Sequence, residues 1–507
     1  MRRIATLAVG LWLAAGLATA GETLPPLDDA QLDVVPRTQA ERARVGAVQA
    51  PATDFSAAQP FEGLPGGGAT AKPRALNRQA FSAPSGNMSL DRRAEFFVGN
   101  GFFQKLWVTA PSSTQSSDGL GPLYNARSCQ RCHLMDGRGH PPSGPEDDAV
   151  SMLLQLGKPG GDPIAEIPDY IAMEPDPVYG HQFQDFAAPG LDAEGRVSVT
   201  YEEVPVALAG GETVSLRRPT VGILDPKFGP LDPATRISAR IAPPMIGAGL
   251  LEAIPAERIL ALADPDDANG DGISGRPNIV MSDVFGKPML GRFGWKAGKP
   301  SVAEQSATAF SNDIGISTPM KPASWGDCTE TQVACREAPM GAGPGETEIN
   351  QEAFDTVVFY SRNLAVPPRR GEGDAEVLRG KQVFYAAGCA SCHVAAHVTN
   401  RLKDQPEQSF QLIWPYTDML LHDMGPDLDD GKPEGRATGA EWRTAPLWGI
   451  GLTEVVGGEV ALLHDGRARN VLEAVLWHGG EAQAARDKVV ALPPEDRAAL
   501  IAFLNSL

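Results

Sequence analysis

Two copies of a Cys-x-x-Cys-His motif are the strongest chemical signal in the sequence. Their members are Cys129, Cys132 and His133 in the first copy and Cys389, Cys392 and His393 in the second. On one helical turn, two thiols at this spacing can add across the two vinyl groups of a haem, while the adjacent histidine offers its imidazole to the iron. Zinc sites and thioredoxin-like sites do not need that histidine. The sequence therefore predicts two covalently attached haem c groups, with His133 and His393 as proximal iron ligands.

The sixth ligand of each iron decides whether a haem only passes electrons or also binds a substrate. His478 ends a helical stretch over residues 471–478. We favour it as the distal ligand of the second haem over a role as an exposed or core histidine. His422 and Met424 are competing ligands for the same iron, and the choice among the three stays open at this stage.

The first twenty residues have the three parts of a secretory signal peptide. Arg2 and Arg3 form the positive start, residues 4–17 the apolar stretch and residues 18–20 a small-residue cleavage site. A retained membrane anchor is the weaker alternative, because the apolar run is shorter than the ~20 residues that a bilayer span needs. We expect residues 1–20 to be removed, leaving a periplasmic chain with no membrane span.

Export also bears on the two remaining cysteines and on possible partners. Cys328 and Cys335 lie in a Gly/Pro-flanked stretch, and an oxidising compartment favours a structural disulfide between them. Loss of Arg2 and Arg3 lowers the net charge by two, from −19 to −21. So acidic a chain is a poor candidate for binding nucleic acid or anionic lipid.

The chain divides into two halves that resemble each other. Residues 240–252, after the first motif, match residues 443–454, after the second, which are one residue shorter. Each half closes with an expected amphipathic helix, near residues 351–364 and 495–507. Roughly 110 residues separate the first motif from its matching segment, against roughly 55 in the second half, so the first half carries an insertion.

Part of the insertion has the pattern of a β-hairpin. Residues 197–201 alternate between apolar and polar, and residues 206–208 face residues 213–216 across a Gly-Gly turn. With short helices and loops elsewhere, we predict a mostly α fold. It has two cytochrome c-like domains, the first with a long insertion that contains a small β-sheet.

The predicted domain boundary lies near residue 370, where Pro367 and Pro368 end the earlier helix. The N-terminal haem c domain then spans residues 86–369 and the C-terminal cytochrome c domain residues 370–507. Residues 21–85 are rich in Pro, Ala, Gln and Gly and show no sustained period. They are predicted to form a disordered N-terminal arm.

Several longer segments carry a resemblance to a known family. They include residues 119–129, 291–297 and 415–425 and the turn from His464 to Arg467. From about residue 90 to the end, the chain resembles the bacterial di-haem oxidoreductase family, also labelled thiol oxidoreductase-like. That family is related to the di-haem cytochrome c peroxidases and to the di-haem enzyme that matures methylamine dehydrogenase. The resemblance implies peroxide reduction at the N-terminal haem and electron entry at the C-terminal haem. The donor would be a small redox protein, a c-type cytochrome or a cupredoxin.

The resemblance also implies roles for single residues. Trp295 takes the place of the tryptophan between the two haems, Gln305 that of a peroxide-site glutamine, and Asp313 lies near the distal acid. In the related peroxidases that acid is a glutamate two positions further along. At the position of His478 they usually have methionine, and a histidine ligand here would lower the potential of the C-terminal haem. When the two halves are aligned by the internal repeat, Ala309 in the first half corresponds to His478. Alanine cannot bind iron, so we expect the distal face of the first haem to be open.

Residues 264–275 have the first half of a calcium-loop pattern. Oxygen ligands stand at alternate positions, with Asp267, Asn269 and Asp271 as the predicted Ca²⁺ ligands and a glycine after the third. The bidentate acid of an EF-hand is missing, which disfavours that motif. Related di-haem enzymes hold calcium between their haem domains, which supports a calcium loop of another type. A plain acidic turn is the alternative, and the choice between the two stays open.

Three functions are compatible with these patterns. The leading hypothesis is a periplasmic, peroxidase-like di-haem oxidoreductase, with Gln305 and Asp313 as catalytic residues. The first alternative is an electron-transfer cytochrome with two six-coordinate irons, and the second is a haem partner in iron or metal uptake. A thiol oxidoreductase is disfavoured, because haem attachment and the disulfide would use all six cysteines.

Overall fold

The computed structural model describes residues 27–72, 76–114, 117–144, 147–148 and 150–507. The predicted signal peptide, residues 1–20, lies outside the described residues. No helix in the described part of the chain combines the length and apolar character needed to cross a membrane.

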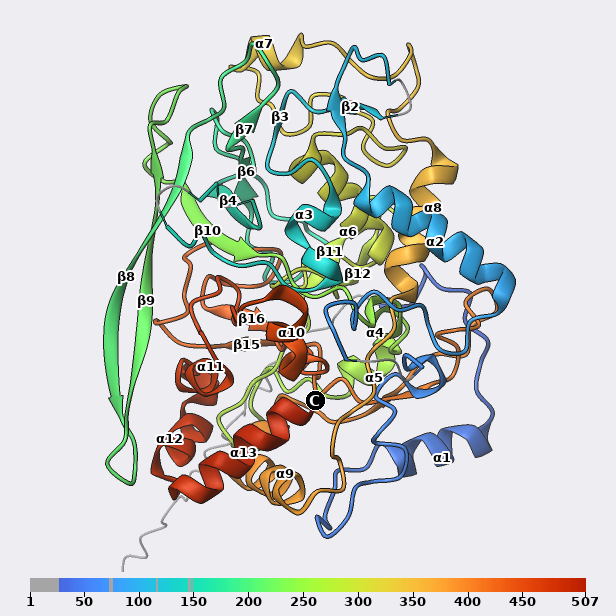
Figure 1. Cartoon of the computed structure of the whole chain (residues 1–507), viewed down its shortest axis with the longest axis vertical. Helices are drawn as coiled ribbons and strands as arrows, with labels where there is room; N and C mark the ends of the chain where they lie inside the picture. Colours follow the sequence, from blue (N-terminus) through green and yellow to red (C-terminus); the bar gives the residue numbers. More distant parts are fainter. Residues whose placement is uncertain (1–26, 73–75, 115–116, 145–146, 149) are drawn as a thin grey trace, which may run out of the picture.

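Each half of the chain is built around a crossing pair of helices. In the first half α2 (Leu90–Gln104) packs on α8 (Gln351–Asn363), and in the second half α9 (Ala375–Ala387) packs on α13 (Pro494–Ser506). The observed α8 and α13 confirm the two closing helices predicted from their apolar periodicity. In Figure 1 the first pair is blue (α2) with amber (α8), and the second pair is orange (α9) with red (α13).

A glycine permits the close approach of the helices at each crossing. A Cβ atom on Gly99 would collide with the carbonyl group of Thr356, and one on Gly380 would collide with that of Ala499. Because glycine has no Cβ, it is the residue that fits at both crossings. Thr356 and Ala499 also occupy matching positions in the two closing helices, so the internal repeat extends to the helix packing.

The two matching segments of the repeat lie against each other. Gly247 and Gly449 both have left-handed φ values, 70° and 74°. Gly247 N–H donates to the carbonyl of Leu364 (2.9 Å), and Gly449 N–H donates to that of Leu507 (3.0 Å). Gly247 faces Trp448, which precedes Gly449, and Gly449 faces Ile246, which precedes Gly247. Such reciprocal contacts are those of two halves related by an approximate two-fold axis.

Most of the longer strands belong to the insertion of the first half. β8 (Arg196–Ala207) and β9 (Thr213–Leu224) pair antiparallel along their whole length, and the pairing of Val206 with Val214 confirms the predicted hairpin. In Figure 1 this hairpin runs down one side of the molecule towards α12 (Gln483–Ala491). A second sheet is centred on β4 (Met152–Pro159).

The remaining elements are short. Within the second sheet, β4 pairs with β10 (Arg236–Ile241), β5 (Met173–Glu174) and β6 (Gln182–Phe183). Other strands are β1 (Val108–Thr109), β2 (Asp118–Leu120), β3 (Leu123–Tyr124), β7 (Phe186–Ala187), β11 (Ile279–Met281), β12 (Pro288–Leu290), β13 (His397–Val398), β14 (Leu412–Ile413), β15 (Leu421–Asp423) and β16 (Glu441–Arg443). Other helices are α1 (Gln39–Val48), α3 (Cys129–Cys132), α4 (Ala248–Glu252), α5 (Ala256–Leu260), α6 (Val302–Ala309), α7 (Val333–Arg336), α10 (Thr453–Gly457) and α11 (Val471–Leu476).

The prediction of a mostly α fold is wrong, because only 27% of the chain is helical and 17% is strand. Most of the strands form separate two-stranded sheets. The physical reason is the abundance of residues that end regular structure, with 55 glycines and 44 prolines in the chain. Strands of two or three residues are too short to show a periodic pattern. Periodicity therefore predicted the long helices but not the short strands.

The predicted disordered arm also differs from the structure. The described part of residues 27–85 packs on the body of the protein, and α1 begins with a capping box at Thr38. Glu62 from this segment is buried and forms ion pairs with Arg369 and Lys381. The Tyr416 hydroxyl also donates to Glu62 (2.9 Å). Composition alone missed this packing because the partners of the segment lie more than 300 positions away.

Two buried apolar clusters lie next to the Cys-x-x-Cys-His motifs. One contains Phe96 and Phe354 and packs against Cys129, and the other contains Phe384 and Phe503 and packs against Cys389. The crossing helix pairs contribute these phenylalanines to both clusters. Each helix pair therefore forms one wall beside a motif.

The buried ion cluster gives the first prediction. Glu62→Gln keeps the shape of the side chain but leaves the charges of Arg369 and Lys381 without a counter-ion. Removing one partner of a buried ion pair costs about 3–5 kcal/mol, so we expect the free energy of unfolding to fall by that amount in urea denaturation. Lys403→Ala is the control, because its ion pair with Asp33 of the same segment is exposed. Equal stability of the Glu62 variant and the wild type would contradict the prediction.

Candidate haem sites

The two motif histidines have the same hydrogen-bond arrangement. His133 Nδ1 donates to the carbonyl of Pro243 and His393 Nδ1 to that of Tyr416, each at 2.8 Å. With Nδ1 as the donor, Nε2 keeps the lone pair that an iron ion needs. Burial lowers the pKa of both imidazoles to about 4, so they are neutral at neutral pH. Both histidines thus fit the part of a proximal haem ligand.

The motif cysteines also fit haem attachment. Cys129, Cys132, Cys389 and Cys392 form no disulfide in the described structure, although each pair has the spacing of a disulfide-forming motif. Burial raises the pKa of Cys129 and of Cys389 to about 12 and also raises the pKa values of Cys132 and Cys392. The other two cysteines, Cys328 and Cys335, form a disulfide with Cα atoms 6.2 Å apart.

A cavity of about 360 Å³ adjoins the second motif. Its lining includes Cys389, Cys392 and His393, and the side chain of His478 also lines it. Most of the other lining residues are apolar or aromatic, among them Phe384 and Trp442. A cavity of this size and polarity, with few polar groups at fixed places, suits a large flat apolar ligand.

His478 has the environment expected of a second axial ligand. It follows α11, and its Nδ1 donates to the Ala474 carbonyl (2.7 Å), which again leaves Nε2 without a proton. Burial lowers the pKa of His478, and the nearby imidazole of His478 contributes to the low pKa of His393. The geometry therefore keeps His478 as the favoured ligand, while Met424, which also lines the cavity, remains an alternative.

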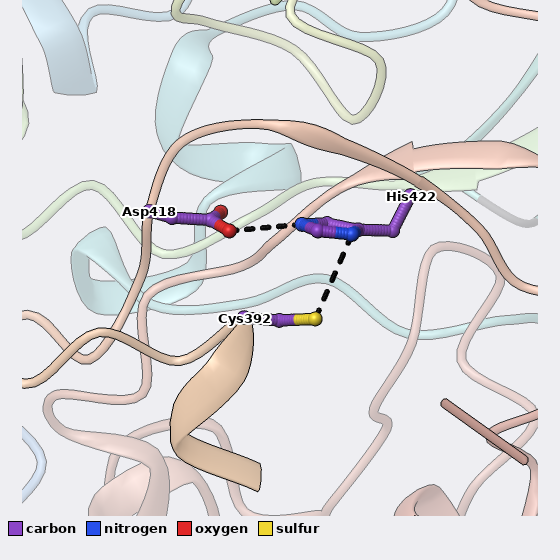
Figure 2. Close-up of side chains that lie close together, drawn as sticks. All are labelled: Cys392, Asp418 and His422. Carbon is purple, nitrogen blue, oxygen red and sulfur yellow. Dashed lines mark hydrogen bonds and ion pairs between the residues drawn. The ribbon is translucent and has the colours of Figure 1, made fainter. Parts of the chain in front are cut away.

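His422 does not fit the role of an iron ligand. Its Nε2 bonds to Asp418 (2.8 Å) and its Nδ1 to Glu481 (2.7 Å), so neither nitrogen has a free lone pair. Figure 2 shows the ring between Asp418 and Cys392, whose Sγ lies 3.6 Å from Nδ1. The two carboxylates raise the pKa of His422 well above its usual value despite burial. His422 is thus a buried imidazolium beside a motif sulfur.

Cys392, Asp418 and His422 bring three ligand atoms within 4.8 Å of one another. No other group of three or more His, Cys, Asp or Glu side chains among the described residues lies so close together. A protonated imidazole is not a metal ligand, and the thiol belongs to the haem motif. We therefore interpret the group as a charge cluster that orients His422.

Trp295 contacts segments from both halves of the chain. Its side chain lines the cavity of the second motif, and its Nε1 donates to the Ile241 carbonyl (2.8 Å). The guanidinium of Arg138, from the segment that follows His133, lies 5.5 Å from the centre of the Trp295 ring. The structure thus brings Trp295, the first-motif segment and the second-motif cavity together.

Asp313 lies beside the first motif. It is part of a π-helical turn, Phe310–Ile314, that extends α6, and its carbonyl accepts from the N–H groups of Asn125 and Ala126. Its negative charge raises the pKa values of Cys129 and Cys132. Burial raises the pKa of Asp313 itself to about 6.

Sequence reasoning missed Gln182, which holds the Asp313 carboxylate. Gln182 is buried on β6, and its Nε2 donates to Asp313 Oδ1 and to Asn125 Oδ1, both at 2.8 Å. Asn125 donates in turn to Asp185, whose pKa burial raises to about 8. No sequence motif marks Gln182 or Asp185, because the insertion brings them to the first motif only in the fold.

Gln305 and Ala309 lie on α6. Gln305 is half-buried, about two turns before Asp313, and its Oε1 approaches Gly294 next to Trp295. The helix begins with a Ser301 cap on Glu304 N–H, as α11 begins with an Asn470 cap on Glu473 N–H. This shared capping pattern supports the register that places Ala309 at the slot of His478.

Of the predicted calcium ligands, Asn269 and Asp271 are exposed and Asp267 is half-buried, and all three hydrogen-bond to their own loop. Asp267 accepts from Gly272 N–H (3.1 Å), Asn269 from Asp271 N–H (2.8 Å), and Asp271 from Ile273 N–H (3.0 Å). These hydrogen bonds stabilise the turn. The described residues of the loop do not bring three carboxylate, histidine or cysteine ligand atoms close together, as Cys392, Asp418 and His422 do. Calcium binding at this loop stays a prediction.

The charge cluster around His422 gives the second prediction. A raised pKa in the folded state adds stability that is complete below the pKa of an unfolded histidine, about 6.5, and is lost as pH rises through the folded value. The cost of His422→Gln in free energy of unfolding should therefore be larger at pH 6 than at pH 9 in urea denaturation. The control His181→Gln alters an exposed histidine that pairs with Asp327. A His422→Gln cost independent of pH would disprove the charged state.

Three comparisons with known proteins place this geometry in context. No curated protein matches the chain. Among solved structures, one titled "Kuenenia stuttgartiensis Hydrazine Synthase Pressurized with 20 bar Xenon" is similar at 15% identity and a TM-score of 0.22. The match covers 32% of this chain and 57% of that one, and so low a score carries no argument. A family model described as "Di-haem oxidoreductase, putative peroxidase" matches residues 63–158 and 179–507, which include both motifs, and the chain therefore belongs to the di-haem oxidoreductase family.

Proposed function

We propose that the protein is a periplasmic di-haem c-type oxidoreductase that reduces peroxide at the N-terminal haem and receives electrons at the C-terminal haem. Family membership supplies the oxidoreductase class and haem binding. The single observation that carries the finer proposal is the difference between the surroundings of the two motifs. The predicted signal peptide supports the periplasmic location.

The two sites differ at the face opposite the proximal histidine. At the second motif, His393 and His478 line one cavity, and each has Nε2 available. At the first motif, the equivalent of His478 is Ala309, and the nearest chemistry is the carboxyl group of Asp313. A haem with two histidine ligands suits electron transfer, whereas an open face beside an acid suits a reaction.

The residues of the first site can handle the protons of peroxide reduction. A haem bound there would supply an open iron that binds peroxide and delivers electrons to its O–O bond. The Asp313 carboxylate takes the proton from the inner peroxide oxygen and returns it to the outer one, as a general base and then acid. An amide donor, assigned to Gln305, stabilises the negative charge that develops on the outer oxygen before that proton arrives, so that the oxygen leaves as water. A carboxyl pKa of about 6 suits both steps near neutral pH.

Electron delivery involves the second site and an outside donor. Trp295, between the first-motif segment and the second-motif cavity, is the residue that we assign to the path between the haems. We assign the donor to the small soluble redox proteins, a c-type cytochrome or a cupredoxin. The strongly negative charge of the chain favours a donor with a basic docking face.

Visible and EPR spectroscopy of the oxidised and one-electron-reduced protein tests the proposal. We expect one low-spin haem with two histidine ligands and one high-spin ferric signal that peroxide removes, with peroxide turnover by the reduced protein. Low-spin signals alone in both states would instead mean an electron-transfer cytochrome. An open site without turnover, in a protein that forms a complex with an envelope receptor, would favour a role in metal uptake.

Covalent attachment gives the third prediction. The mature chain from a host that matures c-type cytochromes should weigh two haems more than its polypeptide, and acidified acetone should extract no haem. The native protein should show no reactive thiol, since four cysteines carry haem and two form the disulfide. Cys389→Ala and Cys129→Ala are matched variants that should each weaken attachment at one motif only. Extractable haem in the wild type would contradict the c-type assignment.

The acid at the first site gives the fourth prediction. Peroxide turnover should fall as pH drops below about 6, because a protonated Asp313 cannot take the first proton. Asp313→Asn should lower turnover by about 10²- to 10⁴-fold and abolish this acidic limb, with both haems retained. Asp192→Asn, at an exposed acid of the same half, is the control. Unchanged turnover in the Asp313 variant would end the assignment.

Gln182 allows a finer test of the same site. Its hydrogen bond favours the charged form of Asp313 and lowers the pKa of that carboxyl. Gln182→Leu should therefore raise the Asp313 pKa and move the acidic limb of the rate profile to higher pH. A fall in rate without a shift of the limb would mean that Gln182 acts on the fold rather than on Asp313.

A further inference from the structure

Arg138 is a half-buried cation that has no anionic partner among the described residues. Its Nε and Nη1 atoms are shielded from solvent and have no hydrogen-bond partner among the described residues. Burial, with no compensating acid, lowers the pKa of Arg138 to about 10. A buried guanidinium with unpaired N–H groups is costly unless an anion pairs with it.

Other buried arginines of this chain have such partners. Arg240 pairs with Glu434 (2.7 Å), Arg292 pairs with Asp29 (2.6 Å), and Arg369 pairs with Glu62. Arg443, which lines the same cavity as Arg138, donates to the carbonyls of Gly294 and Thr444. In this cavity the Nε and Nη1 atoms of Arg138 have neither an acid nor a carbonyl partner among the described residues, which leaves them available to a bound anion.

The position of Arg138 indicates where that partner lies. It follows the first motif in sequence but lines the cavity of the second motif, with its guanidinium near Trp295. Its backbone is fixed there, because the next residue, Gly139, donates its N–H to the Ala242 carbonyl (2.9 Å). A Cβ on Gly139 would collide with the backbone carbonyl and the Cβ of Ser151, so glycine permits this close approach of the two segments.

The expected occupant of this cavity carries the matching charge. A haem has two propionate carboxylates, and arginine is the side chain best suited to pair with a carboxylate in a desolvated site. We propose that Arg138, contributed by the N-terminal half, pairs with a propionate of the haem held at the C-terminal motif. This inference rests on the proposed function only in placing a haem at that motif.

The pairing would adjust the redox properties of the C-terminal haem. A cation beside the macrocycle favours the reduced state, which carries one more negative charge, and so raises the reduction potential. The charge of Arg138 thus opposes the second histidine ligand, which lowers the reduction potential of the same haem. The charge that sets the potential of one haem would thus be carried by the segment that binds the other.

The test is a spectroelectrochemical titration of both haems in five variants. Arg138→Leu removes the charge, and Arg138→Lys keeps the charge but not the planar fork of donors. Arg486→Leu removes a competing cation that lies near His478 in the same cavity. Arg218→Leu is the matched control, because it removes an exposed arginine paired with Asp427. His478→Ala identifies which of the two potentials belongs to the C-terminal haem.

We expect Arg138→Leu to lower the potential of the C-terminal haem, Arg138→Lys to lower it less, and Arg218→Leu to leave it unchanged. Loss of the C-terminal haem alone in Arg138→Leu, with recovery in Arg138→Lys, would support the same contact. Unchanged potentials with two haems retained, a shift of the N-terminal haem alone, or a shift in Arg486→Leu instead would overturn the proposal. Peroxide turnover plays no part in this readout, so a protein without peroxidase activity would contradict the proposed function and leave this test decisive.

Discussion

Each haem site depends on one hydrogen bond, from the Nδ1 of a motif histidine to a backbone carbonyl. That bond fixes the tautomer and the direction in which Nε2 points, so the accepting carbonyl must itself be held still. At the second motif the carbonyl belongs to Tyr416, whose backbone has a left-handed φ of 54° and whose hydroxyl donates to buried Glu62. Glu62 in turn pairs with Arg369 and Lys381. The N-terminal segment therefore contributes to the orientation of a ligand more than 300 positions later in the chain.

The two halves share a framework and differ in what is added to it. Both have a glycine at the helix crossing, a left-handed glycine in the matching segment and a capped helix that leads to the distal slot. The second half fills that slot with His478, while the first half has Ala309 and receives Gln182 from its insertion. A duplicated fold thus acquires two chemical environments through one substitution and one inserted segment.

The sequence predicted the parts of the fold that have a long period or a fixed motif. The closing helices and the β8–β9 hairpin carry enough residues for their periodicity to be unambiguous, and the Cys-x-x-Cys-His spacing identifies its chemistry locally. The strands of two or three residues and the packing of residues 27–85 depend on distant partners, so no local pattern shows them. The same holds for the site: Asp313 was found through resemblance, whereas Gln182 and the unpaired Arg138 become visible only when the chain is folded. His422 illustrates the reverse error, because a histidine near a haem motif suggests a ligand until its two carboxylate partners are known.

The long hairpin has a mechanical meaning. Its tip joins the second half, where Ala209 N–H donates to the Val490 carbonyl and Arg497 bonds to Glu212. Further along, Arg217 donates to the carbonyls of Gly466 and Arg467. A strap of this kind resists hinge-like separation of the two halves. In the proposed di-haem enzyme, any rearrangement that accompanies a change of oxidation state would then occur within side chains and short loops, and the spacing of the two haem irons would stay constant.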